Sequence, residues 1–468
     1  MTTTAAIVAP ILFGLALGAW ASRAEVSPPA SVAPAFVTDV PGIREEMLDP
    51  EYWIGRLRDD EIRMTAAEIG TFNAKNFARG EHLHDLDQFP QRLKRTRVLA
   101  LLDTVSRPAS TPRFHTDDSP LTPRDYAALE ASTQRARIPA EVRVRWGMVV
   151  RRANMRSFPT QMRIYKNPQD TDLDRLQETG VFPGQRLALL HESTDGNWWF
   201  AVNYHYAAWL PKSAVAVGDR DEIDRWSQRE PRLLVTGAQV QTNFNPDDPR
   251  TSQVALDMGV SLPLLSAADV GYQVNGQNPY ASYIVSLPAR AADGSLEFVP
   301  TLIARSRDVH RGALAYRDSA LLRQAFKFLG ERYGWGHDYN GRDCTGFIGE
   351  VYKSFGILMP RNSGQQGRGG FAPTRFFGEG DEKRRRDALG SLQVGDLIYM
   401  PGHVMMYIGD VSGEPYVIHD VTGLRYYDSE KNFYSGTLSG VSVTPLKPLW
   451  LSRDKSFVDS IYAIKTIL

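Results

Sequence analysis

The sequence contains a single cysteine, Cys344, among 468 residues. A disulfide within the chain is therefore excluded, and so is a zinc site built from cysteines alone. An excess of one charge is also absent, because 54 Lys and Arg residues balance 54 Asp and Glu residues. Nucleic-acid-binding proteins usually carry a net basic surface, so this balance argues against that class of protein.

The apolar run near the amino terminus, residues 7–19, is shorter than the about 20 residues that a membrane span needs. It ends in Ala19-Trp20-Ala21, which fits the small-x-small pattern of a signal-peptide cleavage site. We therefore predict a signal peptide over residues 1–21 and export to the periplasm or cell envelope. No Lys or Arg precedes the run, so a buried N-terminal helix and an uncleaved membrane anchor stay open. No cysteine follows the run, which argues against a lipoprotein.

The rest of the composition is typical of a globular protein, with 42% hydrophobic and 23% charged residues. The length predicts about three domains. Apolar spacing, Pro and Gly signals and short β-like runs divide the chain. The predicted segments are a helical arm and linker over 22–140, a small β-barrel over 141–219, a second β-barrel over 220–310, and a mixed domain over 311–468, which together give an α+β fold.

Cys344 is predicted to open a helix. Apolar residues recur with helical spacing from Phe347 to Phe355, and Gly356 is a suitable residue to end the helix. Asp343 stands where a helix N-cap belongs. A thiol on the first turn meets free N–H groups and the positive end of the helix dipole, which lower a cysteine pKa to roughly 3.5–7.5. A buried, inert cysteine is the alternative.

Two histidines flank a predicted β-hairpin in the last domain. His403 and His419 lie in alternating apolar runs, at positions symmetric about residue 411, inside the turn signal of residues 410–413. The start of the first strand and the end of the second should then lie side by side. One imidazole can act as the base for a thiol while the other fixes its tautomer. Two ordinary strand histidines are the alternative.

The motifs around these residues resemble the NlpC family of papain-like cell-wall cysteine peptidases. The matching segments are Tyr333-Gly-Trp335-Gly336, Arg342-Asp343-Cys344-Thr345-Gly346-Phe347, Gly395-Asp396-Leu397 and Gly402-His403-Val404. Thr345 stands where that family commonly has Ser. The resemblance runs from about Asp318 to the carboxyl end. The segment 151–160 resembles the bacterial SH3-like domains that precede such catalytic domains in the subgroup that cleaves γ-D-glutamyl–diamino-acid bonds. The arm is similar to the N-terminal extension of that subgroup.

The resemblance implies a role for each matched residue. Cys344 would be the nucleophile, His403 the general base and His419 the residue that orients it. Tyr333 would help the Cys344 backbone N–H to stabilise the oxyanion. The subgroup contacts its substrate peptide at the positions of Asp343, Thr345 and Ser363, with Asp343 facing a free L-alanine amine; a helix cap at Asp343 and a loop serine at Ser363 are the alternatives. A tyrosine of the first barrel is also implied, and Tyr165, Tyr204 and Tyr206 all stay open.

We therefore predict a papain-like cysteine peptidase domain behind two SH3-like barrels. It would hydrolyse the γ-D-glutamyl–diamino-acid bond of peptidoglycan stem peptides, during turnover or recycling, as a monomer without metal or cofactor. Three alternatives stay open: a papain-like amidase or acyltransferase, a wall-binding scaffold without catalysis, and a zinc site made by the cysteine and both histidines. His and Asp residues are frequent at 82–87, but their spacing matches no recognised metal site, so we predict a solvated loop there. The basic run 383–386 is flanked by acids and favours a solvated turn.

Overall fold

The computed structural model describes residues 36–468. The predicted signal peptide lies outside the described residues. Within them, no helix is both long and apolar enough to cross a membrane. Residues 38–468 form one compact unit, which contains the arm, both strand-rich regions and the carboxyl-terminal domain.

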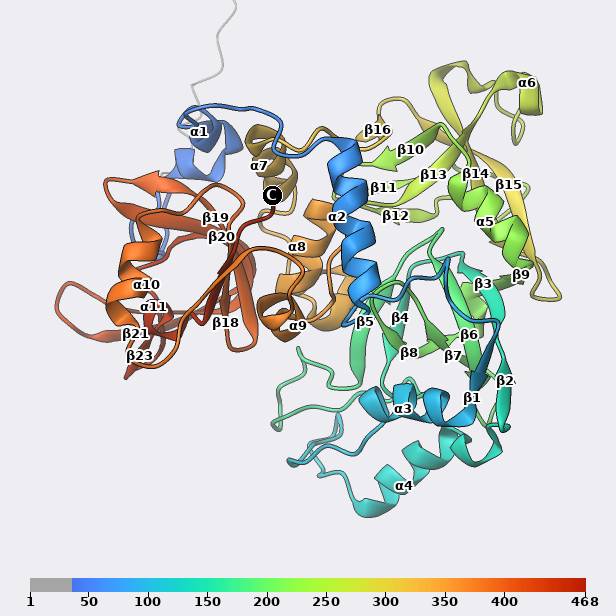
Figure 1. Ribbon diagram of the computed structural model, residues 1–468, viewed down its shortest axis with the longest axis horizontal. Coiled ribbons are helices and arrows are strands. Elements are labelled where there is room, and N and C mark those ends of the chain that lie inside the picture. Colours follow the sequence, from blue (N-terminus) through green and yellow to red (C-terminus); the bar gives the residue numbers. More distant parts are fainter. Residues whose placement is uncertain (1–35) are drawn as a thin grey trace, which may run out of the picture. The chain divides into compact units, whose positions relative to one another are not determined.

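The amino-terminal arm is helical and packs on its neighbours (Figure 1). Its elements are η1 Glu45–Leu48, α1 Pro50–Ile54, α2 Ala66–Arg79, β1 Arg92–Lys94, α3 Arg95–Val105, α4 Pro123–Ser132 and η2 Arg135–Arg137. Thr65 and Glu68 form a capping box that starts α2. Trp53 of α1 is 1% exposed and contacts the carboxyl-terminal domain through Tyr416, with ring centroids 5.3 Å apart. The arm therefore buries its apolar residues against other domains rather than in a core of its own.

The first strand-rich region forms a seven-stranded antiparallel sheet in the order β5-β4-β8-β7-β6-β3-β9. Its strands are β3 Arg145–Val149, β4 Ala153–Arg156, β5 Gln177–Val181, β6 Arg186–Glu192, β7 Trp198–Val202, β8 Ala207–Pro211 and β9 Val215–Gly218, with η3 Lys212–Ala214 before the last. Every residue of β7 is buried, which requires cover on both faces. Helix α3 supplies part of that cover, and Trp209 Nε1 donates to Ser106 Oγ at 3.1 Å. A short strand β2, Glu141–Arg143, pairs with β1 of the arm.

The second strand-rich region is built around a five-stranded antiparallel sheet in the order β15-β14-β13-β10-β16. Its elements are α5 Arg220–Gln228, β10 Arg232–Val235, β11 Gln239–Gln241, β12 Ala255–Asp257, β13 Ser261–Leu265, α6 Ala267–Val270, η4 Pro279–Ala281, β14 Ser282–Arg290, β15 Leu296–Ala304 and β16 Val309–Arg311. Strands β11 and β12 pair separately. This pairing places Asp257, fully buried, at the border with the carboxyl-terminal domain.

The carboxyl-terminal domain has a six-stranded sheet in the order β17-β24-β18-β19-β20-β21. Its strands are β17 Thr374–Phe376, β18 Leu397–Met400, β19 His403–Val411, β20 Glu414–Tyr427, β21 Phe433–Pro445 and β24 Ala463–Lys465, with a small hairpin of β22 Trp450–Ser452 and β23 Lys455–Ser456. Its helices are α7 Asp318–Phe326, η5 Trp335–Asn340, α8 Cys344–Lys353, α9 Ser363–Arg368, α10 Glu382–Leu389 and α11 Phe457–Ser460.

Alternating residues of β18 and β19 divide between two apolar clusters on opposite faces of this sheet. Helices α7 and α8 cover one face, and α10 and α11 cover the other (Figure 1). The predicted helix at Cys344 is confirmed, and it ends at Lys353. Helix α7, which precedes it in the same domain, ends at Phe326.

The hairpin register differs from the prediction. Ser412 and Gly413 form the turn with positive φ, and Met406 faces Ile418 across the strands. The turn lies beyond residue 411, and a β-bulge between Tyr407 and Gly409 moves the pairing back by one residue, so His403 and His419 are diagonal rather than direct neighbours. The offset is an even number of residues, which keeps both side chains on one face of the sheet.

Candidate active site

Cys344 is the first residue of α8 and is 7% exposed. The carboxylate of Asp343 caps the helix by accepting the backbone N–H of Gly346 at 2.8 Å. Burial, and then the charge of Asp343, raises the pKa of Cys344 to about 12. The predicted lowering of this pKa is wrong for the unliganded site, because burial and a neighbouring carboxylate outweigh the helix dipole. The thiol is therefore protonated at rest.

The two histidines form one hydrogen-bonded pair. Nε2 of His403 lies 2.9 Å from Nδ1 of His419, and Nε2 of His419 lies 3.0 Å from the hydroxyl of Thr444. Burial lowers the pKa of His403 to about 4 and that of His419 well below its usual range, so both rings are neutral at pH 7. His419 holds the ring of His403 through the Nε2 atom of His403. The Nδ1 atom of His403 is then free to accept a proton.

Strand β19 brings this histidine pair to the thiol. Helix α8 packs on β19 and β20. The backbone N–H of Val404, the residue after His403, forms a hydrogen bond with the Cys344 sulfur. The structure thus collects the predicted cysteine and both predicted histidines at the amino-terminal end of α8, as a Cys/His pair requires.

Asp343 is held by Arg361, which is 4% exposed. The Arg361 guanidinium donates to both carboxylate oxygens, at 3.1 Å and 2.7 Å. The same carboxylate accepts hydrogen bonds from the backbone N–H of Gly336, the backbone N–H of Gly346 and the hydroxyl of Thr345. Burial alone would raise the pKa of Asp343, but the charge and hydrogen bonds of Arg361 hold it well below its usual range.

This arrangement favours the helix-cap interpretation of Asp343. Five hydrogen bonds, two of them from a buried cation, occupy the carboxylate, so no acceptor is left over for a substrate amine. Thr345 is similarly engaged, because its hydroxyl also accepts from Arg361 at 2.6 Å. No motif marks Arg361, which lies beyond the end of the helix that it supports.

Tyr333 is partly buried in the loop before η5, and its backbone N–H donates to Ser439 at 2.9 Å. Burial, and then the charge of Cys344, raises the pKa of Tyr333 well above its usual range, so its hydroxyl stays a donor. Ser363 begins α9, and its carbonyl accepts the hydroxyl of Tyr462 at 3.4 Å. Asn362, which caps α9, separates Ser363 from Arg361.

The structure distinguishes the three tyrosines of the first barrel. The hydroxyl of Tyr206 reaches the side chain of Asn362 and donates to the carboxylate of Glu178. Tyr165 accepts instead from Arg163 at 3.1 Å, and the ring of Tyr204 stacks on His205 at 4.0 Å. Only Tyr206 of the three therefore contacts the residue next to Ser363.

Glu178 is a site residue that sequence reasoning missed. It lies half-buried on β5, beside Tyr206. Burial raises the pKa of its carboxyl to about 7, because desolvation outweighs the hydrogen bond from Tyr206. No motif marks this residue, and its position at the site depends on how the barrel packs on the carboxyl-terminal domain.

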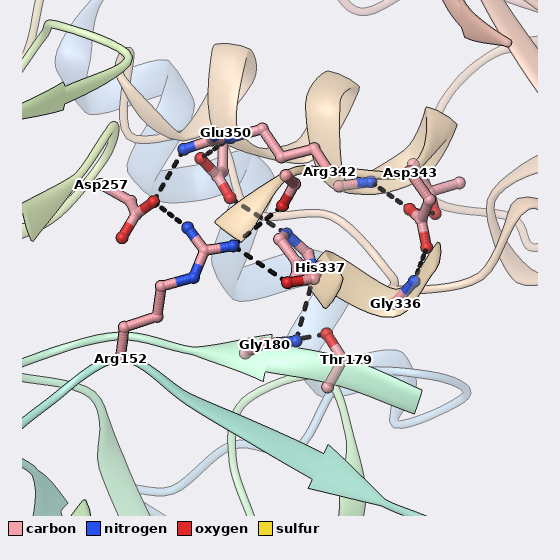
Figure 2. Close-up of polar contacts among 12 residues, drawn as sticks. Arg152, Thr179, Gly180, Asp257, Gly336, His337, Arg342, Asp343 and Glu350 are labelled. Atoms are coloured by element: carbon pink, nitrogen blue, oxygen red, sulfur yellow. Dashed lines mark hydrogen bonds and ion pairs between the residues drawn. The ribbon is translucent and has the colours of Figure 1, made fainter. Parts of the chain in front are cut away.

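A buried ionic network connects the nucleophile loop to both barrels (Figure 2). Asp257 of the second barrel accepts from Arg342 at 2.9 Å and also binds Arg152 of the first barrel. Arg342 donates to Glu350 at 2.6 Å, and Glu350 lies 3.0 Å from Nε2 of His337. Burial lowers the pKa of His337 to about 4, so the ring is neutral and donates to Glu350.

The other nitrogen of His337 ties this network to the first barrel. Its Nδ1 accepts the backbone N–H of Gly180 at 3.2 Å (Figure 2). Gly180 has no room for a side chain, since a Cβ there would lie 2.8 Å from His337. The chain just before Cys344 is therefore fixed from two barrels, through charges and through close backbone contact.

Asp420 follows His419 and is 1% exposed. Both of its carboxyl oxygens lack a hydrogen-bond partner among the described residues. Burial, and then the charge of Asp343, raises the pKa of Asp420 well above its usual range. Sequence reasoning missed this residue, which adjoins the histidine pair without contacting it.

Comparison with known proteins identifies two domains. The family model described as NlpC/P60 family matches residues 330–442, and the model described as SH3 domain (SH3b1 type) matches residues 163–211. The chain therefore carries an NlpC/P60 domain of papain-like fold and an SH3b domain, which confirms the predicted resemblance and fold class.

Individual relatives agree with these matches. The chain is 29% identical over 255 residues to a gamma-D-glutamyl-L-lysine dipeptidyl-peptidase of Bacillus cereus, and the match covers 50% of this chain and 65% of that protein. It is 35% identical over 99 residues to a probable endopeptidase p60 of Listeria innocua, covering 19% of this chain and 18% of that one. The chain thus spans less than two thirds of the length of each of these curated relatives.

A solved structure supports the fold over almost the whole chain. An NlpC/P60 endopeptidase from Photobacterium damselae subsp. piscicida superposes with a TM-score of 0.71, covering 89% of this chain and 96% of that one. The two sequences are 18% identical, so this likeness bears on the fold alone.

Proposed function

We propose that the chain is a cysteine endopeptidase that hydrolyses the γ-D-glutamyl–diamino-acid bond of peptidoglycan stem peptides. The observation that carries the proposal is the placement of Cys344 at a helix tip beside the His403–His419 pair, inside an NlpC/P60 domain. The name of the Bacillus cereus relative supports the choice of bond. Export to the periplasm or cell envelope, as a monomer, belongs to the same proposal, because the substrate lies there.

The chemistry starts from a neutral thiol and a neutral imidazole. His403 takes the thiol proton at Nδ1 as Cys344 attacks the γ-carbonyl carbon of D-glutamate. The backbone N–H of Cys344, at the helix amino terminus, and the hydroxyl of Tyr333 stabilise the resulting oxyanion. His419, held by Thr444, keeps the imidazolium oriented.

The second half of the reaction returns the enzyme to its resting state. His403 gives its proton to the departing amine of the diamino acid, which leaves a thioester on Cys344. His403 then accepts a proton from water as the water attacks the thioester. Release of the γ-glutamyl carboxylate restores the thiol.

Substrate recognition in this proposal involves the first barrel. Asp343 is fully hydrogen-bonded, so its role is to cap α8. Glu178 is half-exposed and ionises near pH 7, so its carboxylate is available for a free L-alanine amine. Tyr206 positions that carboxylate, Thr345 contacts Arg361, and Ser363 begins α9 just after that arginine.

The test uses purified muropeptides and the Cys344→Ala variant. We expect the wild type to release products whose masses assign the cut to the glutamate–diamino-acid bond, and the variant to release none. A Cys344→Ser variant is the matched control, because it keeps the shape of the site but replaces the sulfur nucleophile. Cleavage at another bond would favour the amidase or acyltransferase alternative. Unchanged hydrolysis by Cys344→Ala would remove the proposal.

A further inference from the structure

A cleft of about 630 Å³ lies where the two barrels meet, next to the carboxyl-terminal domain. Its walls come from the β3–β4 connection of the first barrel, from the end of β14 and from the β11–β12 connection of the second. Five arginines line it, and no carboxylate does: Arg151, Arg152, Arg156, Arg250 and Arg290. A wall with this composition carries positive charge, in a chain whose formal net charge is zero.

Three of these arginines are neutralised by acids outside the cleft. Arg152 pairs with Asp257, and Figure 2 shows its guanidinium turned toward that residue. Arg156 pairs with Asp174 at 2.8 Å. The third arginine, Arg250, pairs with Asp248 at 2.7 Å and with Glu297 at 2.6 Å.

The other two arginines have no acidic partner within 4.0 Å among residues 36–468. Arg151 is exposed and donates to the backbone carbonyl of Pro249 at 3.1 Å. Arg290 is half-buried and donates to the backbone carbonyl of Val215 at 3.1 Å. Backbone carbonyls hold both guanidinium groups in place without an ion pair, although Asp293 in the turn after β14 lies near enough to feel the charge of Arg290.

The remaining lining fits a peptide ligand. Amide side chains of Asn154, Gln161 and Asn340 offer donors and acceptors, and Trp198 adds an apolar wall. Guanidinium forks match carboxylates in two-point geometry, and a planar fork that is already positioned loses little entropy on binding. Asn340 belongs to η5, four positions before Cys344, so the cleft adjoins the nucleophile loop.

We propose that this cleft binds the carboxylates of an acidic peptide, with Arg151 and Arg290 as the charged contacts. Stem peptides carry such carboxylates, so the cleft would hold an uncut stem near the one being hydrolysed. The identity of the peptide rests on the proposed function, whereas the carboxylate site itself does not. A chain without net charge would in this way retain its substrate through one local basic surface.

The experiment measures binding of the full chain in the Cys344→Ala background, so that no cleavage interferes. The probe is purified sacculi in a sedimentation assay, with and without prior hydrofluoric acid treatment to remove phosphate-linked polymers. We expect Arg151→Gln/Arg290→Gln to weaken binding about tenfold, because two charge-assisted contacts are lost. Arg151→Lys/Arg290→Lys should keep most of the binding. Arg137→Gln/Arg143→Gln, two exposed arginines outside the cleft, is the matched control with the same charge change.

Each result decides the proposal. An equal loss in the control pair would overturn it in favour of unspecific charge attraction. Loss of binding after acid treatment would overturn it in favour of a phosphate polymer. If the double Gln variant fails to fold, Arg151→Gln alone must weaken binding at least twofold, and an unchanged value would overturn the site. Because binding is read without turnover, failure here differs from failure of muropeptide hydrolysis by the wild type.

Discussion

The two barrels have similar strand texture in the sequence but act on the site in different ways. The first barrel contributes side chains at the proposed substrate side, because Tyr206 reaches Asn362 and donates to Glu178. The second barrel contributes Asp257, which is fully buried and pairs with Arg152 and Arg342. We therefore propose that the first barrel serves recognition at the cysteine, whereas the second barrel holds the nucleophile loop and adds Arg290 to the separate carboxylate cleft.

The largest expected effect concerns the second barrel. Replacing Asp257→Asn removes the charge shared by Arg152 and Arg342. The buried Arg152 is then left without an acidic partner, whereas Arg342 keeps two others. We expect a loss of about 3 kcal/mol in the free energy of unfolding, measured by urea titration. Asp269→Asn, on an exposed pair of the same barrel, should change stability by less than about 0.5 kcal/mol. If Asp257→Asn keeps its stability but loses turnover, the second barrel acts in catalysis or recognition rather than in holding the loop.

The next effect concerns the first barrel. Glu178→Gln keeps the shape of the side chain but removes the charge that faces a substrate amine. We expect kcat/KM for a free L-Ala-γ-D-Glu-diamino-acid tripeptide to fall about thirtyfold, since a charge-assisted contact contributes about 2 kcal/mol. The N-acetylated tripeptide should be insensitive to the change. Glu192→Gln, half-buried elsewhere on this barrel, is the control, and an equal loss with both substrates would contradict amine recognition.

The pH dependence sharpens the same comparison. The pKa of Glu178 is about 7, so the carboxylate loses its charge as the pH falls through that value. We expect kcat/KM for the free tripeptide to fall about tenfold from pH 8 to pH 6. His403, with a pKa of about 4, stays neutral across this range and adds no slope. A slope that persists in Glu178→Gln would assign the titration to another group.

The smallest expected effect separates the tyrosines. Tyr206→Phe removes the hydrogen bond that favours the ionised form of Glu178, so the acid limb of the pH profile should move to higher pH. At pH 7 we expect kcat/KM to fall about fivefold, as for the loss of about 1 kcal/mol from one hydrogen bond. Tyr165→Phe should stay within twofold, because its hydroxyl contacts Arg163 instead. If Tyr206→Phe and Tyr165→Phe lower kcat/KM equally, Tyr206 has no special role at the site.

Local patterns in the sequence predicted the local parts of the site. The helix that begins at Cys344 follows from apolar spacing and an N-cap acid, both of which act within a few residues. The histidine pair also follows from the hairpin pattern, although the turn position and the β-bulge after Tyr407 together shift the register by an amount that alternation cannot reveal. Since the shift is even, the error left the two rings on the same face.

The parts that could not be predicted depend on contacts between distant segments. Arg361 fills the carboxylate of Asp343, and this converts an expected substrate contact into a helix cap. The pKa of Cys344 was mispredicted because burial depends on the packing of α8 against β19. Tyr206 could not be chosen over Tyr165 or Tyr204 from strand texture, since only the packing of two domains shows which hydroxyl reaches Asn362.

Asp257 has a consequence for how such a protein can be recombined. Its single carboxylate is shared by an arginine from each of two other domains, so three segments depend on one another for charge balance. An exchange of the second barrel for a homologous one would succeed only if the incoming domain brings an acid to the same place. The two barrels and the carboxyl-terminal domain are separate in sequence but share one buried ion-pair network. A chimaera should therefore keep all three domains together.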